Sequence, residues 1–396
     1  MAAVGELLRQ HMPADQVSWV AAARDLGRGP LAARAAVFDR ENRFPTENYD
    51  DLRAAGLLAL TVPKAYGGIG ADAVTYVGVL AELSKGCAAT GLTFNMHCAI
   101  VDFLTQIGSS EQQRRYFGEV VEEGAIFASI TSEPASSFRD VFKVKTAIER
   151  DGDGFRLNGK KAWCSLSTAA RYYFTWSRLT GSASLADGLL NLMVPSSAEG
   201  IEILDDWDTI GMRATASNSI NFNNVRIEPK DVIGAPGILL TKDLSFWSLG
   251  YTTVYIGIAE AAYDYCLEHG RRQLERVEAD SPQAVRVHRQ IGQMSMTLEG
   301  ARLATEKLAL MRGRLDRAQL TYTLNQAKYL ATEAAYAVSE QGMRMLGGSG
   351  ISRALPMQQY LRDALPGLVM PPANDRCIET VGRIALGLEA KTVEFS

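Results

Sequence analysis

The amino-acid sequence predicts an α+β protein with a helical N-terminal domain, a middle β-barrel domain and a C-terminal four-helix bundle. Two observations carry this prediction. Helical periodicity dominates the first and last thirds of the chain, whereas strand periodicity with turn dipeptides dominates the middle. A chain of 396 residues is also long enough for two or three domains. We therefore place the domains at 1–127, 128–234 and 235–396.

The N-terminal domain is predicted from apolar residues at helical spacing. Asn48 is expected to cap one of its helices, which Gly56 then ends. Pro63 and the glycines that follow it interrupt the pattern and predict a loop. The expected helices cover 20–38, 47–56, 74–85, 89–107 and 110–123.

The middle domain is predicted from alternation and turn signals. The segment VKTAI at 144–148 alternates between polar and apolar residues. Asp151-Gly152 predicts a turn, and Asn158-Gly159 predicts a β-hairpin. Short apolar segments follow as further strands, so we expect a compact domain built from strands.

The C-terminal domain is predicted from long amphipathic segments joined by short links, which are typical of an up-and-down bundle. Its expected helices cover about 250–277, 284–313 and 317–346, and a last helix begins near Asn374.

The composition excludes several classes of protein. Hydrophobic residues make up 47% of the chain, charged residues 22%, and the net charge is −4, which does not suggest a nucleic-acid partner. No apolar run reaches the roughly 18 residues of a membrane span, and the N-terminus lacks a signal-peptide pattern. The five scattered cysteines and four histidines lack metal-ligand spacing. We expect reduced thiols, no metal site, no membrane contact and a cytoplasmic location.

Four segments carry more specific information. They read ASITSEPASSFRD at 128–140, LNGKKAWCSLS at 157–167, DTIGMRATASNSINFNNVRIEPKDVIG at 208–234 and MRMLGGSGISRALPMQQYLRDA at 343–364. In content, order and separation they resemble the acyl-CoA dehydrogenase superfamily over nearly the whole chain. The matching family patterns are a T-E-P segment, an N-G-x-K-x-W-I-T segment, a G-M-R-x-T strand entry and an L-G-G-x-G turn before R-D-A.

The resemblance implies a non-covalently bound FAD. In the family, hydroxyls at the positions of Thr131 and Ser132 donate to the isoalloxazine ring, and a Trp at the position of Trp163 lies against it. Ser165 takes the place of a family Thr whose hydroxyl bonds the N5 region. A flavin ring needs such donors and an apolar face. From the residues alone, Trp163 could equally be a core aromatic and the serines edge-strand residues.

The resemblance also implies cofactor contacts from a neighbouring subunit. Gly347 and Gly348 open the turn that approaches the cofactor's phosphates in the family, and Arg344 replaces a family Gln. Arg272 lies in the degraded counterpart of a segment that grips flavin in trans. The glycine turn can also serve as a helix cap. The resemblance therefore implies a homo-oligomer, a dimer or a homotetramer.

The chain departs from the family at the catalytic base. The commonest subclass carries a Glu in a Y-E-G-T segment before the last helix, and the spacing from Arg362 places Pro371 there. Proline supplies neither a carboxylate nor an N–H. Trp247 occupies the other position at which family members carry the base. The candidate replacements are foremost His97 and Asp375, and then Glu379. His97 equally suits a core, Asp375 a helix N-terminus and Glu379 a solvated or intersubunit position.

Three functions stay open. The first is FAD-dependent oxidation of an acyl thioester, bound to CoA or to a carrier protein, with a rebuilt acid/base site, a separate electron acceptor and a specialised pathway. We place it first because the R-D-A segment resembles the dehydrogenase branch. The second is a monooxygenase that receives reduced flavin from a flavin reductase and uses dioxygen; the missing Glu, His97 and Ser165 favour it mildly. The third is a flavin-binding paralogue without catalysis.

Overall fold

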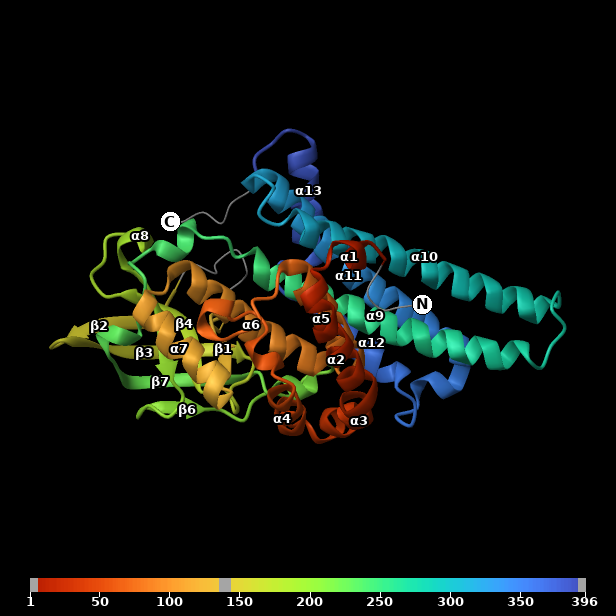
Figure 1. Cartoon of the computed structure of the whole chain (residues 1–396), viewed down its shortest axis with the longest axis horizontal. Helices are drawn as coiled ribbons and strands as arrows, with labels where there is room; N and C mark the ends of the chain where they lie inside the picture. Colours follow the sequence, from red (N-terminus) through yellow and green to blue (C-terminus); the bar gives the residue numbers. More distant parts are fainter. Residues whose placement is uncertain (1–5, 135–143, 391–396) are drawn as a thin grey trace.

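Helices, a β-sheet and a second set of helices follow one another along the chain, and they remain separate in space (Figure 1). The structure is a computed structural model that describes residues 6–134 and 144–390. The sheet lies at one end of the molecule. The long C-terminal helices project toward the other end, and the N-terminal helices lie against both. The expected fold class is confirmed.

The N-terminal domain is built around α5 and α6, whose side chains are almost all buried. Asp72 caps α5 by accepting the N–H of Thr75, and a capping box between Ser109 and Gln112 starts α7. The helices are α1 (Glu6–His11), α2 (Val17–Leu26), α3 (Ala32–Glu41), α4 (Thr46–Ala54), α5 (Ala73–Gly86), α6 (Ala88–Ile107) and α7 (Ser110–Glu123).

Two local predictions in this domain were wrong. The helix expected over 20–38 is broken at Gly29 and Pro30, because proline cannot donate the hydrogen bond that would continue α2. Asn48 is not a cap. It lies buried inside α4, where its side-chain amide donates to the Thr90 hydroxyl at 2.8 Å.

The middle domain is one mixed sheet with the order β6-β7-β3-β2-β4-β5-β8, and β1 pairs in parallel with β4. Within the described residues, β6 and β8 are therefore the two edge strands of this order. The strands are β1 (Phe127–Ser129), β2 (Ala147–Asp151), β3 (Gly154–Cys164), β4 (Tyr172–Leu179), β5 (Leu189–Pro195), β6 (Ile201–Ile203), β7 (Asn218–Ile227) and β8 (Val232–Ile233).

The turn signals in this domain had mixed outcomes. The Asp151-Gly152 turn is confirmed, since it joins β2 to β3 with Gly152 in the left-handed region. The hairpin expected at Asn158-Gly159 was wrong, because both residues lie inside β3. There the pairing with β7 shifts register, and the Asn158 side chain accepts the N–H of Asn224.

Three helices of 30 residues each form the core of the C-terminal domain, as expected: α9 (Ser245–Leu274), α10 (Pro282–Met311) and α11 (Arg317–Leu346). Two shorter helices follow, α12 (Met357–Val369) and α13 (Asn374–Ala385). α9 approaches α5 and α6 closely. A Cβ at Gly250 would lie 1.8 Å from the Asn95 side chain, so only glycine lets these helices meet. None of the helices in the described ranges is long and apolar enough to cross a membrane.

Candidate functional site

The segment after β1 lies against the end of β3. Ala162 donates its N–H to the Ser132 carbonyl at 3.0 Å, and the Lys161 ammonium lies 3.4 Å from the Thr131 carbonyl. Lys161 is fully buried and pairs with Glu133 at 2.8 Å. The Glu of the first motif and the Lys of the second thus hold Thr131 and Ser132 beside the end of β3.

Glu133 also accepts two backbone N–H groups and a hydroxyl from Lys145 and Thr146. Burial alone would raise the pKa of the Glu133 carboxyl, but Lys161 and these donors outweigh it and lower the pKa. The carboxylate is therefore ionised and fully bonded, which suits a structural role.

Trp163 is an exposed aromatic residue at the end of β3, with 63% of its surface accessible. Its φ of 60° lies in the left-handed region, which is costly for a non-glycine residue. The Trp207 ring packs edge-on against it, with centroids 5.8 Å apart and planes at 84°. Trp207 in turn donates its indole N–H to the carbonyls of Arg213 at 3.0 Å and Met212 at 3.3 Å. Trp163 thus has one supported edge and a large open surface.

Ser165 lies next to Trp163 and is half-buried. Its hydroxyl is 2.8 Å from the Ser217 hydroxyl, which is 2.7 Å from the Thr215 hydroxyl. Thr215 donates to the Met212 carbonyl at 2.9 Å. The structure therefore gathers Thr131, Ser132, Trp163 and Ser165 at the end of β3, together with Ser217, Thr215 and Trp207, which could not be singled out from the sequence.

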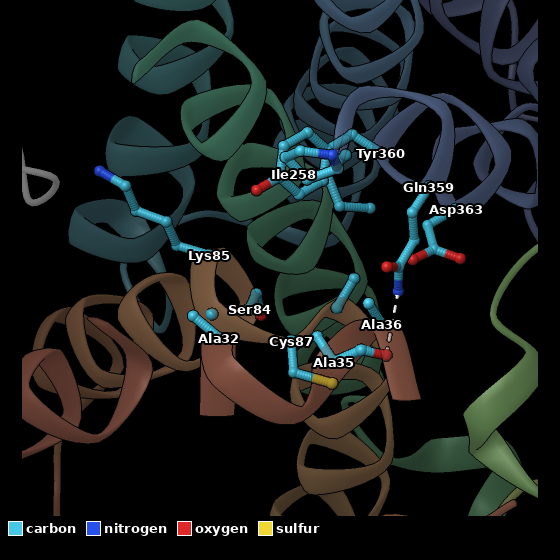
Figure 2. Close-up of a pocket in the computed structure, with 13 residues that line it drawn as sticks. Ala32, Ala35, Ala36, Ser84, Lys85, Cys87, Ile258, Gln359, Tyr360 and Asp363 are labelled. Carbon is cyan, nitrogen blue, oxygen red and sulfur yellow. Dashed lines mark hydrogen bonds between the residues drawn. The ribbon is translucent and has the colours of Figure 1, made fainter. Parts of the chain in front are cut away.

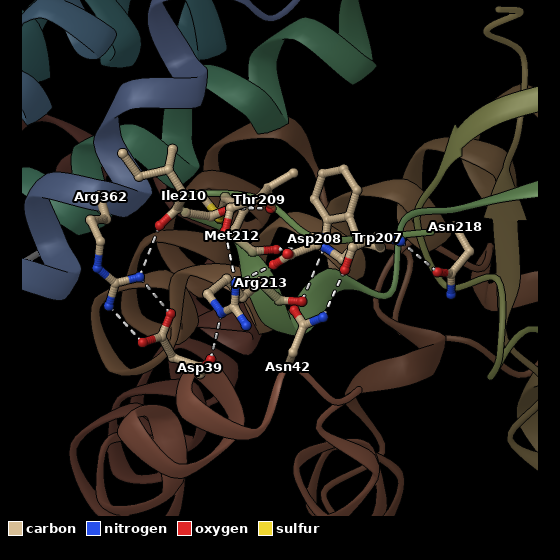
Figure 3. A network of polar contacts seen from close by, with 11 residues as sticks. Asp39, Asn42, Trp207, Asp208, Thr209, Ile210, Met212, Arg213, Asn218 and Arg362 are labelled. Carbon is tan, nitrogen blue, oxygen red and sulfur yellow. Dashed lines mark hydrogen bonds and ion pairs between the residues drawn. The ribbon is translucent and has the colours of Figure 1, made fainter. Parts of the chain in front are cut away.

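Polar contacts tie this end of the sheet to both helical domains (Figure 3). Arg362 of α12 pairs with both oxygens of Asp39 in α3, at 2.8 and 2.6 Å, and donates to the Ile210 carbonyl at 3.0 Å. Arg213 donates to the Asp39 carbonyl at 2.9 Å, and Asn42 donates to the Trp207 carbonyl at 2.7 Å. We call these contacts the three-domain clasp. The three-domain clasp links the G-M-R motif to the R-D-A motif through Asp39, and the Asn42 side chain holds the backbone of Trp207.

Asp363, next to the clasp, accepts the Met212 N–H at 2.6 Å. Its burial raises the pKa of its carboxyl to about 7. A small cavity of about 70 Å³ lies beside it, between α3, α5, α9 and α12 (Figure 2). Ligand pockets usually measure about 300–1,000 Å³, so this cavity has room for a few water molecules but not for a substrate.

His97 is buried and fully hydrogen-bonded. Its Nε2–H donates to the Leu58 carbonyl at 2.8 Å, and its Nδ1 accepts the Phe127 N–H at 3.1 Å. Burial lowers the pKa of the imidazole to about 4. The ring is therefore neutral, with both nitrogens engaged, and it ties α6 to the first residue of the sheet. Neither nitrogen is free in this geometry for the acid/base role predicted for His97.

Asp375 and Pro371 lie in or beside the link between α12 and α13. Both are exposed, and Asp375 is in the first turn of α13, where a negative charge stabilises the helix. The buried Lys328 holds this link by donating to the Gly367 carbonyl and the Asn374 side chain, both at 2.7 Å. The end of the first motif, at 135–140, lies outside the described residues.

A carboxylate that the sequence analysis missed lies on α6, one turn beyond His97. Asp102 pairs with Arg312, the residue after the end of α10, at 3.2 Å, and burial raises the pKa of its carboxyl. Arg312 stacks over Phe246, the neighbour of Trp247. The signal was a charged residue in an otherwise apolar helix, which often marks either a buried ion pair or a functional group.

Rings next to this carboxylate form an aromatic cluster. The centroid of the Trp247 ring lies 5.6 Å from that of Phe103 and 6.4 Å from that of Phe174. The backbone carbonyl of Phe174 accepts the N–H of Ile130. The cluster therefore adjoins the segment that carries Thr131.

The predicted phosphate-binding residues lie at the far end of the bundle. Arg272 is in the last turn of α9, while Arg344, Gly347 and Gly348 end α11, and all four are exposed. A helix of 30 residues is about 45 Å long, so one chain does not bring them to Trp163. Their predicted role in cofactor binding requires a second subunit.

Comparisons with known proteins agree with this architecture. Family models for the acyl-CoA dehydrogenase N-terminal, middle and C-terminal domains match residues 13–123, 128–225 and 244–371. The short-chain specific acyl-CoA dehydrogenase of Rattus norvegicus mitochondria is 28% identical over 345 residues, which cover 86% of this chain and 82% of that protein. The dibenzothiophene monooxygenase of Rhodococcus erythropolis is 28% identical over 393 residues, which cover 93% of each chain.

Among solved structures, TdsC from Paenibacillus sp. A11-2 with FMN and indole aligns with a TM-score of 0.86 and 23% identity, covering 96% of this chain and 100% of that one. The chain belongs to the acyl-CoA dehydrogenase superfamily. This membership makes it a flavin enzyme, consistent with the expected FAD.

The residues at the end of β3 fit a flavin ring. Trp163 offers an open aromatic surface, and three half-buried residues that carry hydroxyls, Thr131, Ser132 and Ser165, lie near it at the end of β3. An apolar surface with a few polar groups at its rim suits a planar heteroaromatic ring with a polar edge.

Proposed function

We propose that this protein is a flavin-dependent monooxygenase of the acyl-CoA dehydrogenase fold, which uses reduced flavin and dioxygen. One observation carries the proposal. Pro371 stands where the family has its catalytic Glu, and neither His97 nor Asp375 replaces that carboxylate. His97 has both nitrogens engaged, and Asp375 is exposed in the first turn of α13. This order differs from the one that the sequence alone favoured.

Removal of an α-proton from a thioester needs a positioned base. Oxygen transfer from reduced flavin does not need one at that position, because the flavin supplies the electrons that activate dioxygen. The relative from Rhodococcus erythropolis, which matches over 93% of both chains, is a monooxygenase and supports this choice. In the proposed site, Trp163 stacks on the ring, and Thr131, Ser132 and Ser165 bond its polar edge. A flavin reductase would supply the reduced cofactor.

The test follows reoxidation of the flavin-bound protein. The protein is loaded with FAD or with FMN, reduced with dithionite without oxygen, and mixed with aerated buffer. We expect reoxidation in two resolved spectral phases, with hydrogen peroxide released only in the second. A single phase with immediate peroxide release, together with bleaching of the oxidised flavin by acyl-CoA thioesters, would contradict the proposal.

A second candidate is oxidation of an acyl thioester, on CoA or on a carrier protein. Asp102 favours it, because this carboxyl has a raised pKa and lies near the aromatic cluster around Trp247. The test is bleaching of the flavin by a thioester panel in the wild type and in Asp102→Asn. General acid–base catalysis contributes about 10²–10⁴ in rate, so a loss of that size with flavin retained would support this candidate. The variant Pro371→Glu is the companion test, since dehydrogenation that appears only there would confirm the position of the missing base.

A further inference from the structure

Three hydroxyls lead from the buried interior to the proposed flavin site. Thr215 is fully buried, Ser217 is 5% exposed, and Ser165 is half-buried next to Trp163. The oxygens are 2.7 Å apart between Thr215 and Ser217, and 2.8 Å apart between Ser217 and Ser165. The inner end of this chain is the Met212 carbonyl, 2.9 Å from the Thr215 oxygen.

The direction of each proton in the chain follows from counting donors. A hydroxyl carries one proton, and a carbonyl can only accept. The Thr215 proton goes to the Met212 carbonyl, so the proton between Thr215 and Ser217 must belong to Ser217. The proton between Ser217 and Ser165 must then belong to Ser165.

The opposite direction would be costly. It would turn the Thr215 proton toward Ser217 and leave two oxygen lone pairs facing each other at 2.9 Å, in a place that water does not reach. Within the part of the chain that the structure describes, Ser165 Oγ has no hydrogen-bond partner other than Ser217. Its lone pairs are therefore left to accept a hydrogen bond from a group bound next to Trp163.

We propose that this chain of hydroxyls fixes Ser165 as a hydrogen-bond acceptor, so that the site prefers the reduced flavin over the oxidised flavin. The inference rests on the proposed flavin site, with Ser165 facing N5. In oxidised flavin N5 is an acceptor with a lone pair. Two-electron reduction with uptake of a proton at N5 converts it into an N–H donor. An acceptor oxygen at Ser165 bonds the second form and repels the first.

This preference suits a protein that receives flavin already reduced. It opposes a dehydrogenase in which the hydroxyl donates to oxidised N5 and helps it to accept hydride. Ser217 and Thr215 act through Ser165 and are positioning residues, because neither needs to touch the cofactor.

The decisive experiment measures the dissociation constants of oxidised and reduced flavin and the midpoint potential of the bound flavin, with dithionite as the source of electrons. Ser165→Ala removes the acceptor, and Ser217→Ala frees the Ser165 proton to point into the site. We expect both variants to lower the ratio of oxidised to reduced dissociation constants about tenfold, which corresponds to a potential about 30 mV more negative. Ser217→Thr and Thr215→Ser keep the hydroxyls and are the matched controls, with the ratio unchanged.

A ratio that rises in Ser165→Ala would show that Ser165 donates, and it would overturn the inference. An unchanged ratio in Ser217→Ala would overturn it too. These outcomes are separate from the reoxidation test. A protein that reoxidises in one phase but shows the expected shifts keeps this inference and loses the monooxygenase proposal, whereas a protein that binds neither flavin loses both.

Discussion

His97 illustrates how one residue type supports two opposite interpretations. A histidine in an apolar helix suggests an acid/base group near a pocket, yet the same residue can satisfy two buried backbone groups. Here the Leu58 carbonyl, in the helical part of the chain, needs a donor, and the N–H of Phe127, the first residue of β1, needs an acceptor. The neutral imidazole supplies both. No feature of the sequence near residue 97 reveals these distant partners.

The pH dependence of stability tests this role. The pKa of His97 is about 4 in the folded protein and about 6.5 when unfolded, so the unfolded state binds a proton first as the pH falls. This residue's contribution is therefore full above pH 6.5 and is lost progressively toward pH 4, by about 3 kcal/mol. The free energies of unfolding of the wild type and of His97→Gln, measured from pH 7 to pH 4, should converge by that amount.

The comparison must be a difference between the two proteins. Burial raises the pKa of both Asp363 and Glu260 to about 7, and these groups act in the opposite direction over the same pH range. They contribute equally to both proteins and cancel. A constant difference between wild type and variant would exclude the buried neutral histidine.

At the scale of elements, the three-domain clasp joins α3, α12 and the segment before β7. Arg362 and Asp39 are 18% and 12% exposed in their side chains, so their ion pair is largely shielded from water. Asp208, which pairs with Arg213 in the same network, is 87% exposed. The two carboxylates therefore form a matched pair of test positions.

Asp39→Asn should lower the free energy of unfolding by about 2–4 kcal/mol, because it leaves the Arg362 charge without its partner in a site that is largely shielded from water. Asp208→Asn should change it by less than about 1 kcal/mol, since exposed ion pairs contribute little. Chemical denaturation measures both. Equal effects of the two substitutions would mean that the clasp does not hold the domains together.

The elements themselves could be predicted from the sequence where periodicity decides. The segments 110–123 and 317–346 were predicted with the boundaries that α7 and α11 have. The prediction failed where a tertiary contact overrides a local signal. Asn158-Gly159 lies inside β3 because Asn158 bonds Asn224, which is 66 residues away.

The same distinction between local sequence signals and tertiary contacts applies to the candidate site. Thr131, Ser132, Trp163 and Ser165 could be proposed from the sequence because each lies within one of two continuous motifs. Their supports could not be found in this way, because nothing in the sequence indicates that Ser217 continues the hydrogen bonds of Ser165 or that Trp207 packs on Trp163.

At the scale of the whole molecule, the C-terminal bundle exposes apolar side chains. Met296 and Leu303 lie seven residues apart, and so on one face of α10, with 72% and 47% of their surface accessible. Exposed apolar patches mark interaction sites, and a homo-oligomer of this chain would cover one on the bundle. The double variant Met296→Glu/Leu303→Glu should shift the protein toward the monomer in light scattering at micromolar concentration.

Val17 on α2 is 50% exposed and provides the control. Val17→Glu adds a charge of the same kind to the N-terminal domain and should leave the molar mass unchanged. A wild type that is monomeric while it holds flavin would contradict the predicted oligomer.

A comparison of FAD and FMN affinities tests whether Arg344, at the far end of the bundle, contacts the cofactor. If Arg344 contacts the phosphates of a neighbour's cofactor, Arg344→Ala should weaken FAD binding about tenfold, as expected for the loss of one charge-assisted hydrogen bond. FMN lacks the adenosine monophosphate part of FAD and keeps only the phosphate next to the ribityl chain, so its affinity should fall much less. Arg317→Ala, at the opposite end of α11, removes the same charge and should affect neither flavin. Equal losses for FAD and FMN would place the effect elsewhere.

The packing of α9 along α5 has a mechanical consequence. Each long helix of the bundle measures about 45 Å, but α9 contacts α5 as far as the ion pair between Lys85 and Asp264, so only about 15 Å of α9 extends beyond that contact. A tilt of about 5° beyond the contact therefore displaces the end of the bundle by only about 1 Å, which is less than the length of a hydrogen bond. The glycine turn after α11 is thus offered to a neighbouring subunit at a nearly fixed distance from the N-terminal domain.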